Sequence, residues 1–131
     1  MSTHLTAGQA SSESPVLPAT YNDVVRLDLR IGTVVGAVLH PKSRKPMYVL
    51  SIDFGHPFGT RVTSAQLVDN YPNPDALIGR QIAAVLNLSP KPIAGVTSEV
   101  LLLAAAGVNG SVLMVPDLVP DVVVANGVPV R

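Results

Sequence analysis

The sequence lacks cysteine and tryptophan, and its aromatic residues are limited to three tyrosines and two phenylalanines among 131 residues. The absence of cysteine excludes disulfides, thiolate metal ligands and cysteine nucleophiles, and it fits a reducing compartment. His4, His40 and His56 are too scattered to suggest a metal site, and we expect no cofactor. The acidic residues form no spaced acid–base pair, and no glycine-rich phosphate motif is present. We therefore predict that the chain is not an enzyme.

Long apolar runs and an excess of charge are absent as well. The longest apolar stretch, residues 100–106, is interrupted by Gly107 and falls short of the roughly 18 to 20 residues that span a bilayer, so we expect no membrane insertion. The first residues lack the basic start and apolar core of a secretory signal, which makes the cytoplasm the expected location. Nine Lys and Arg residues balance nine Asp and Glu residues, so any binding to nucleic acid must depend on local clusters of cations.

Hydrophobic residues, in contrast, make up 47% of the chain, and charged residues only 14%. A single domain of this length has a small core, so part of this apolar surface is expected to pack in a subunit interface. Residues 119–131 contain several valines that a free tail would not need. We therefore predict a homo-oligomer in which this C-terminal segment packs between subunits.

Apolar residues at every second position predict a series of short strands. Residues 29–39 predict a long strand that bends at its glycines, with one face formed by Leu29, Ile31, Thr33, Val35, Ala37 and Leu39. Residues 48–54 predict a second strand, with one face formed by Tyr48, Leu50, Ile52 and Phe54. Further strands are expected at residues 61–64, 81–88, 98–105 and 112–115, and Asn109-Gly110 suits the hairpin turn before the last of these.

Helical signals are few and short. Residues 1–20 are rich in Ser, Thr, Ala and Pro and predict a mobile leader outside the folded domain of residues 21–131. Thr20 and Asp23 are spaced to cap a helical turn that ends near Leu27. Two brief helices are expected at residues 65–71 and 75–78, separated by prolines.

Together these elements predict an all-β fold with short helices. It is a five-stranded OB-fold barrel with a helix between strands 3 and 4, a short N-terminal helix and a C-terminal dimerisation segment. Barrels of this type usually bind oligonucleotides.

Three segments, residues 28–34, 43–55 and 87–101, resemble one protein family in sequence and order. They are similar to the tRNA-binding domain that is appended to many bacterial methionyl-tRNA synthetases and also occurs alone. Within that family the Lys-Pro-Met-Tyr strand, Ser64-Ala65-Gln66 and residues 93–101 are most similar to the CsaA proteins. The chain departs from the synthetase domains in residues 88–95, where Lys91 is the only basic residue.

The resemblance implies a homodimer that binds tRNA or tRNA-like RNA. It also implies an export-related chaperone, whose partners are unfolded preproteins and the export machinery. The alternative is a stand-alone, structure-specific tRNA-binding module without a chaperone role.

The best candidate for phosphate binding is the loop of residues 40–46. It carries Lys42, Arg44 and Lys45 between two prolines that limit its freedom, although the same residues also suit a solvated loop without a partner. By resemblance to the family, three further cations are expected on the same face of the barrel: Arg30, Arg61 and Lys91.

Polar candidates follow from the resemblance too. Ser98 and Glu99 fall where the family places ligand-contacting groups, but Glu99 also suits a structural role, holding the loop before it or pairing with an arginine. Ser64 and Gln66 either cap the helix expected after them or face the ligand.

Aromatic residues are too scarce to favour base stacking, so shape recognition of folded RNA fits better. Tyr48 and Phe54 are expected in the core, and Phe58 is the best exposed aromatic candidate. A polypeptide ligand would instead need exposed apolar residues. These residues either bracket an extended peptide or fill the barrel mouth or the dimer contact. The candidates are Phe58, Pro90, Pro92, Ile93 and Leu101.

Overall fold

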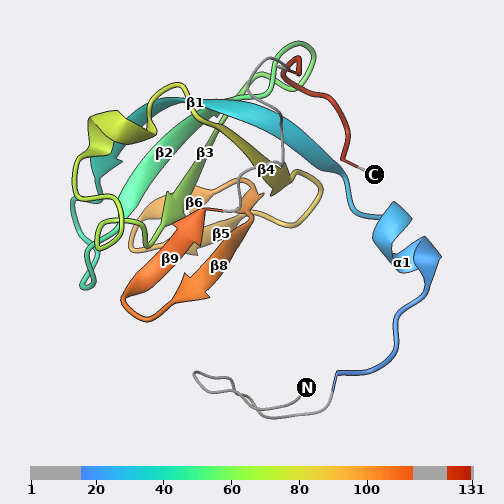
Figure 1. Ribbon diagram of the computed structural model, residues 1–131, viewed down its shortest axis with the longest axis horizontal. Helices are drawn as coiled ribbons and strands as arrows, with labels where there is room; N and C mark the ends of the chain where they lie inside the picture. The colour runs from blue at the N-terminus through green and yellow to red at the C-terminus, as the bar shows by residue number, and fades with distance from the viewer. Residues whose placement is uncertain (1–15, 114–123, 131) are drawn as a thin grey trace.

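A five-stranded antiparallel sheet forms the body of the molecule, and it curls until its two edge strands approach each other (Figure 1). The computed structural model describes residues 16–113 and 124–130. The sheet order is β3-β2-β1-β4-β7, with bounds β1 Leu29–Leu39, β2 Tyr48–Asp53, β3 Thr60–Ala65, β4 Gln81–Val85 and β7 Leu101–Leu102. Two hairpins lie outside this sheet, namely β5 (Lys91–Ile93) with β6 (Val96–Ser98) and β8 (Ala104–Gly107) with β9 (Gly110–Leu113). The predicted OB-type barrel with little helix is confirmed.

The first strand belongs to both halves of the barrel, because β1 pairs with β4 along its first half and with β2 along its second. A bulge between Val34 and Gly36 shifts its register with β2 and changes which side chains point inwards. Val34 is fully buried, whereas Val35 and Leu39 are exposed. The predicted single apolar face along residues 29–39 is therefore wrong, since the extra residue of a bulge interrupts the two-residue period.

The second strand supplies the centre of the core. Its predicted inward face is confirmed, since all four of its members are buried: Tyr48, Leu50, Ile52 and Phe54. β1 passes so close to these side chains that a Cβ on Gly32 would stand 2.7 Å from carbon atoms of both Ile52 and Phe54. Only glycine fits this crossing without moving the core.

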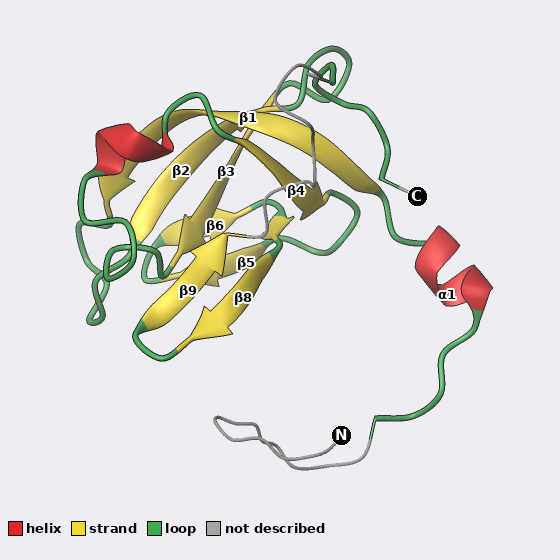
Figure 2. Cartoon of the chain, viewed as in Figure 1, coloured by secondary structure: helices red, strands yellow, loops and turns green. Residues whose placement is uncertain are grey.

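Within residues 16–113 and 124–130, helical structure is confined to two short elements (Figure 2). α1 (Tyr21–Val25) has the predicted capping box, in which the Thr20 hydroxyl accepts from the Asp23 N–H and the Asp23 carboxylate accepts from the Thr20 N–H. The 3₁₀ helix η1 (Pro74–Leu77) lies between β3 and β4 and places Leu77 in the core. Neither helix is long and apolar enough to cross a membrane.

Two predicted elements differ from the structure between β3 and β9. Residues 66–71 form a turn after β3 instead of a helix. The Tyr71 N–H donates to Leu67 O as in a helix, but the Gln66 carbonyl accepts from the Ser111 N–H. Residues 98–105 form no continuous buried strand. They are divided among β6, β7 and β8, which pair with three different partners, and the chain must turn between them. The predicted turn before β9 is confirmed, with Gly110 at φ 91°.

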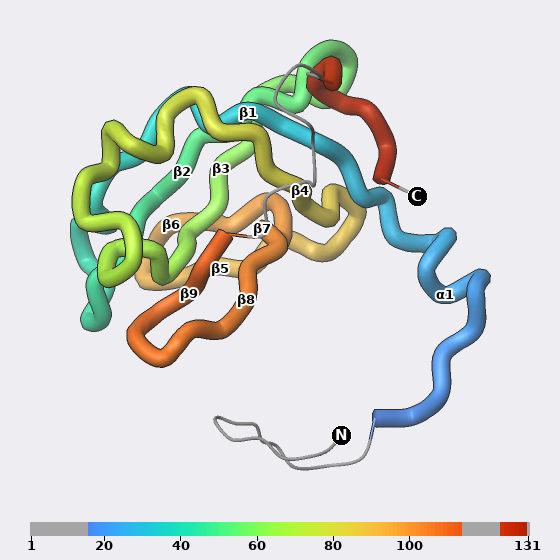
Figure 3. Tube along the Cα trace, viewed as in Figure 1, coloured from blue at the N-terminus to red at the C-terminus, as the bar shows by residue number. Residues whose placement is uncertain are grey.

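The described part of the C-terminal segment lies against β1 (Figure 3). Gly127 N–H donates to Ile31 O, Ile31 N–H to Val128 O, and Val130 N–H to Leu29 O, at 2.8 to 3.0 Å. These bonds occupy the edge of β1 beyond the point where β2 ends. Residues 124–130 therefore pack on their own chain. The predicted subunit contacts of residues 119–123 and 131 lie outside the described residues, as does most of the predicted leader.

Candidate functional site

The β5–β6 hairpin and β3 flank a cavity of about 490 Å³. Seven of the residues singled out from the sequence line it: Ser64, Gln66, Lys91, Ile93, Ser98, Glu99 and Leu101. They reach the cavity from β3, the hairpin and β7, which lie apart in the sequence. Polar residues predicted for RNA and apolar residues predicted for a peptide therefore share one cavity.

Residues Ser98 and Glu99 close the barrel. The Glu99 N–H donates to Val62 O at 2.8 Å, and the Glu99 Oε1 atom accepts from the Val62 N–H at 2.8 Å. The Ser98 hydroxyl accepts from the Ser64 N–H at 2.8 Å. Two side chains thus accept hydrogen bonds from N–H groups on the free edge of β3, where the carbonyls of a neighbouring strand would otherwise be the acceptors. Glu99 takes the structural role foreseen as an alternative, although its partner is β3 and neither the preceding loop nor an arginine.

The polar groups on the β3 side of the cavity differ in what they contact. No helix follows Ser64 and Gln66, so the expected capping role does not apply to either residue. The Gln66 side chain is exposed at the cavity. The Ser64 hydroxyl is buried and has no hydrogen-bond partner among the described residues.

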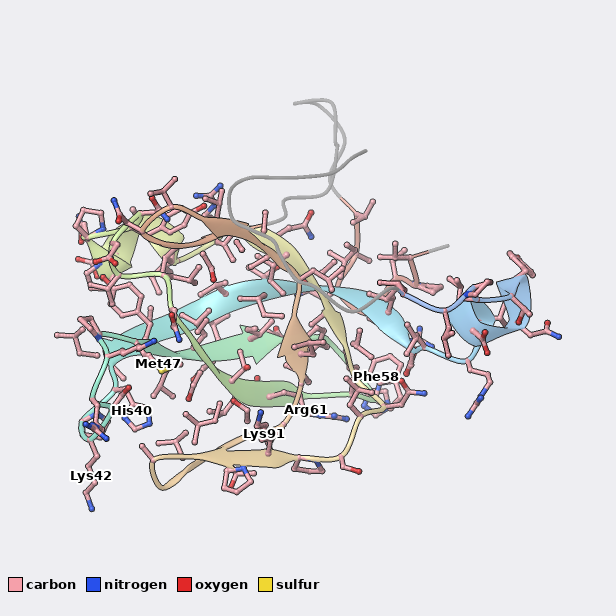
Figure 4. All side chains as sticks on the ribbon, turned by 90° about the horizontal axis from the view of Figure 1, so that it is seen from below. His40, Lys42, Met47, Phe58, Arg61 and Lys91 are labelled. Atoms are coloured by element: carbon pink, nitrogen blue, oxygen red, sulfur yellow. The ribbon has the colours of Figure 1, made fainter. Side chains whose placement is uncertain are left out.

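The loop of residues 40–46, called the cation loop below, lies beside the cavity. Lys42, Arg44 and Lys45 are exposed, and none forms an ion pair within the described part of the chain. The residue after the loop, Met47, lines the cavity, and the loop's first residue, His40, contacts the Ile93 carbonyl at 2.9 Å. Figure 4 shows Met47, Lys91 and Arg61 along the same side of the barrel, with Lys42 at one end of the row. Met47 and the His40–Ile93 contact therefore hold the cation loop next to the cavity.

Arg30 lies away from this loop. Its Nε donates to the Asp28 carboxylate at 2.7 Å, its Nη1 donates to Gly127 O at 2.8 Å, and its guanidinium stacks 4.4 Å from the centre of the Phe58 ring. Figure 4 places Phe58 at the opposite end of the barrel from Lys42. Arg30 therefore lies at the end of the barrel away from the cation loop, where the returning C-terminal segment holds it.

The same packing changes the assignment of Phe58. Its ring is partly buried against the core and would stand 3.3 Å from a Cβ on Gly127, so it is not the exposed aromatic that the sequence suggested. Arg61 donates to the Phe58 carbonyl at 3.1 Å and lies between the two ends. Pro90 and Pro92 are exposed near the hairpin but do not line the cavity.

Two residues at the site were not predicted from the sequence. Met47 lines the cavity although it precedes β2 and lies outside its alternating pattern. His40 is buried beneath the cation loop, where only the His-Pro pair before a basic run hinted at a special role. Among the described residues no cluster of three His, Asp or Glu side chains is placed to hold a metal ion.

A family model named "Putative tRNA binding domain" matches residues 29–124, a range that includes the barrel, the cation loop and the cavity. The chain belongs to the tRNA-binding domain family. The family that three sequence segments indicated is therefore confirmed.

Solved structures agree with this assignment. This tRNA-binding domain is 40% identical to the chaperone CsaA of Bacillus anthracis strain Ames, with a TM-score of 0.78, and the match covers 88% of this chain and 100% of that one. The CsaA chaperone protein of Picrophilus torridus is 36% identical with a TM-score of 0.76, and the match covers 87% and 100% of the two chains.

Curated relatives include the methionine–tRNA ligase of Pyrococcus furiosus, which is 33% identical over 110 residues. That match covers 84% of this chain but only 15% of the ligase. The similarity to the ligase is therefore limited to a small part of the enzyme.

Substitutions at the barrel closure test the roles of Ser98 and Glu99. We expect Ser98→Ala to lower the free energy of unfolding by about 1–3 kcal/mol, because the Ser64 N–H loses its partner in a partly buried position. Glu99→Ala should also destabilise the protein, whereas Glu99→Gln keeps an acceptor oxygen and should have a much smaller effect. Urea denaturation measures all three variants, and equal stability of Glu99→Ala and Glu99→Gln would contradict the assigned hydrogen bond.

Proposed function

We propose that the chain binds tRNA or tRNA-like RNA through the cation loop and Lys91. The observation that carries this proposal is the exposure of three cations in a short loop beside the cavity, none of which forms an ion pair with another described residue. Membership of the tRNA-binding domain family supports the choice of ligand. Ser64, Gln66, Ser98 and Glu99 would form the polar wall next to the bound RNA.

Local charge favours a polyanion although the whole chain is neutral. Around the cavity and its loop, four cations (Lys42, Arg44, Lys45 and Lys91) face one carboxylate, Glu99, a local excess of three positive charges. That excess can attract phosphates at short range, while a neutral total charge limits nonspecific binding.

The cavity suits RNA shape more than base stacking. No aromatic residue lines it, and the exposed Tyr21 lies on α1 instead. Single-strand binders without sequence preference normally stack bases on aromatic side chains. We therefore expect contacts with the phosphates and sugars of folded RNA. Such a function needs no catalysis, and a cytoplasmic site of action fits a chain without cysteine.

A chaperone role is the second candidate, and it would make unfolded preproteins and the export machinery further partners. Leu88 and Leu101 line the same cavity and remain 43% and 52% exposed. Exposed apolar side chains in a concave site suit an extended polypeptide. The similarity to solved CsaA chaperones supports this candidate.

A homodimer would cover a different apolar surface. Val24 and Val25 on α1 are more than half exposed, and with Tyr21 and Val130 they line a second cavity of about 280 Å³. Because no residue of α1 is buried within the chain, we propose that a second copy packs against this helix.

Replacing the three loop cations tests the RNA-binding proposal. If about four phosphates are contacted, log affinity should fall against log salt with a slope near −3 to −4. The triple variant Lys42→Ala, Arg44→Ala, Lys45→Ala should reduce that slope to about −1, because each lost cation leaves one phosphate unneutralised. Fluorescence anisotropy with labelled tRNA at several salt concentrations gives the slope. Arg26→Ala removes an exposed cation next to α1 and serves as the control, and an unchanged slope in the triple variant would refute the proposed surface.

Binding of an unfolded polypeptide has a different signature. Leu101→Ser should weaken polypeptide binding about fivefold, because apolar area inside the cavity is lost, while affinity for tRNA stays within about twofold. Val112→Ser changes a similarly exposed apolar residue outside the cavity and is the control. Isothermal titration with a reduced, unfolded protein measures the effect, and equal binding by both variants would exclude the cavity as the polypeptide site.

Light scattering tests the dimer. Wild type should have about twice the 13.6 kDa mass of one chain, and Val24→Ser with Val25→Ser should lower the mass to that of the monomer. Val108→Ser alters a fully exposed valine at the tip of the β8–β9 hairpin and should leave the dimer intact. A wild-type monomer, or a dimer insensitive to the α1 changes, contradicts the proposal.

A further inference from the structure

His40 connects the cation loop to the β5–β6 hairpin. The side chain is buried, with 8% of the residue exposed, directly after β1. Its Nε2 atom lies 2.9 Å from the Ile93 carbonyl oxygen, and its Nδ1 atom lies 3.1 Å from the backbone nitrogens of both Lys42 and Ser43. One imidazole ring therefore contacts the loop through one nitrogen and the hairpin through the other.

These partners indicate which ring nitrogen of His40 carries the hydrogen. The Ile93 carbonyl can only accept a hydrogen bond, so Nε2 must carry the proton. The N–H groups of Lys42 and Ser43 can only donate, so Nδ1 must present its lone pair. The contacts therefore fit one tautomer, with the hydrogen on Nε2, because a hydrogen on Nδ1 would face two donors.

The other hydrogen bonds of the loop remain within the β1–β2 connection. The His40 N–H donates to Met47 O at 2.8 Å, and the Ser43 hydroxyl donates to Lys45 O at 2.6 Å. Among the described residues, the His40 to Ile93 bond is the one hydrogen bond that links the cation loop to the hairpin. That hairpin carries Lys91, the fourth cation of the surface.

We propose that His40 is the positioning residue of the RNA-binding surface, because its ring sets the cation loop relative to Lys91 before RNA arrives. This inference rests on the proposed function of the loop. A loop that is already placed does not have to be ordered during binding, which favours affinity without adding a contact. Loss of the ring should therefore weaken binding while the number of phosphates in the complex stays the same.

Weaker binding with an unchanged number of contacted phosphates distinguishes the role of His40 from that of the loop cations. We expect His40→Ala to lower tRNA affinity about tenfold at fixed salt, the scale of one or two lost hydrogen bonds and a loop to be ordered. The slope of log affinity against log salt should remain that of wild type, since every cation is still present. An unchanged affinity, or a slope as shallow as that of the triple cation variant, would overturn the proposal.

Two conservative variants identify which contact matters. The amide of His40→Gln reaches as far as Nε2 and can donate to Ile93 O, while the side-chain oxygen of His40→Asn reaches as far as Nδ1 and can accept from the loop amides. We expect His40→Gln to recover most of the affinity and His40→Asn to bind as weakly as His40→Ala. Recovery by His40→Asn alone would mean that the internal turn of the loop is sufficient, and the link to the hairpin would be rejected.

Measurements on wild type keep the test independent of variant folding. Nitrogen-15 chemical shifts of the His40 ring at neutral pH should show a protonated Nε2 and an unprotonated Nδ1, and the opposite pattern would overturn the assignment. Thermal unfolding establishes that each variant is folded before its affinity is compared. If the triple cation variant retains the wild-type slope, the proposed function fails; if only the His40 variants bind like wild type, the positioning role alone fails.

Discussion

The capping of the β3 edge by Ser98 and Glu99 is the interaction on which the site depends. A curled sheet leaves amides unsatisfied along its open edge, and here two side chains and one backbone N–H take the place of a paired strand. The same two residues form part of the cavity wall. Barrel closure and the shape of the candidate binding surface are therefore set by one group of hydrogen bonds.

Sequence patterns predicted the barrel well where one physical signal dominated. The alternation in β2 is set by burial of one face, and the Thr20–Asp23 capping box depends only on local spacing. The prediction failed where a single residue changes the geometry. The bulge in β1 reversed the expected exposure of Val35. The β5–β6 hairpin was not predicted at all, and its turn contains Ala94 at a positive φ of 49°, a conformation that alanine rarely adopts.

The parts of the candidate site that could be predicted are those whose residues lie close together in the sequence. The three cations of the loop were found because they are close together in the sequence. Of the residues that line the cavity, Lys91, Ser98 and Glu99 were found through family resemblance, whereas Met47 was missed. The contacts of Arg30 could not be predicted, because its neighbours Phe58 and Gly127 come from distant segments. His40 was overlooked because its role comes from a carbonyl on β5 rather than from nearby residues.

The pairing of residues 127–130 with β1 has a consequence for folding during synthesis. The first residues of β1 meet partners that follow 97 positions later, as in the contact between Arg30 and Gly127. Contacts between such distant segments form late, because a long loop must close first. The edge of β1 near Leu29 must therefore stay unpaired while most of the chain leaves the ribosome. In that interval a nascent chain exposes a strand edge of the kind that promotes aggregation.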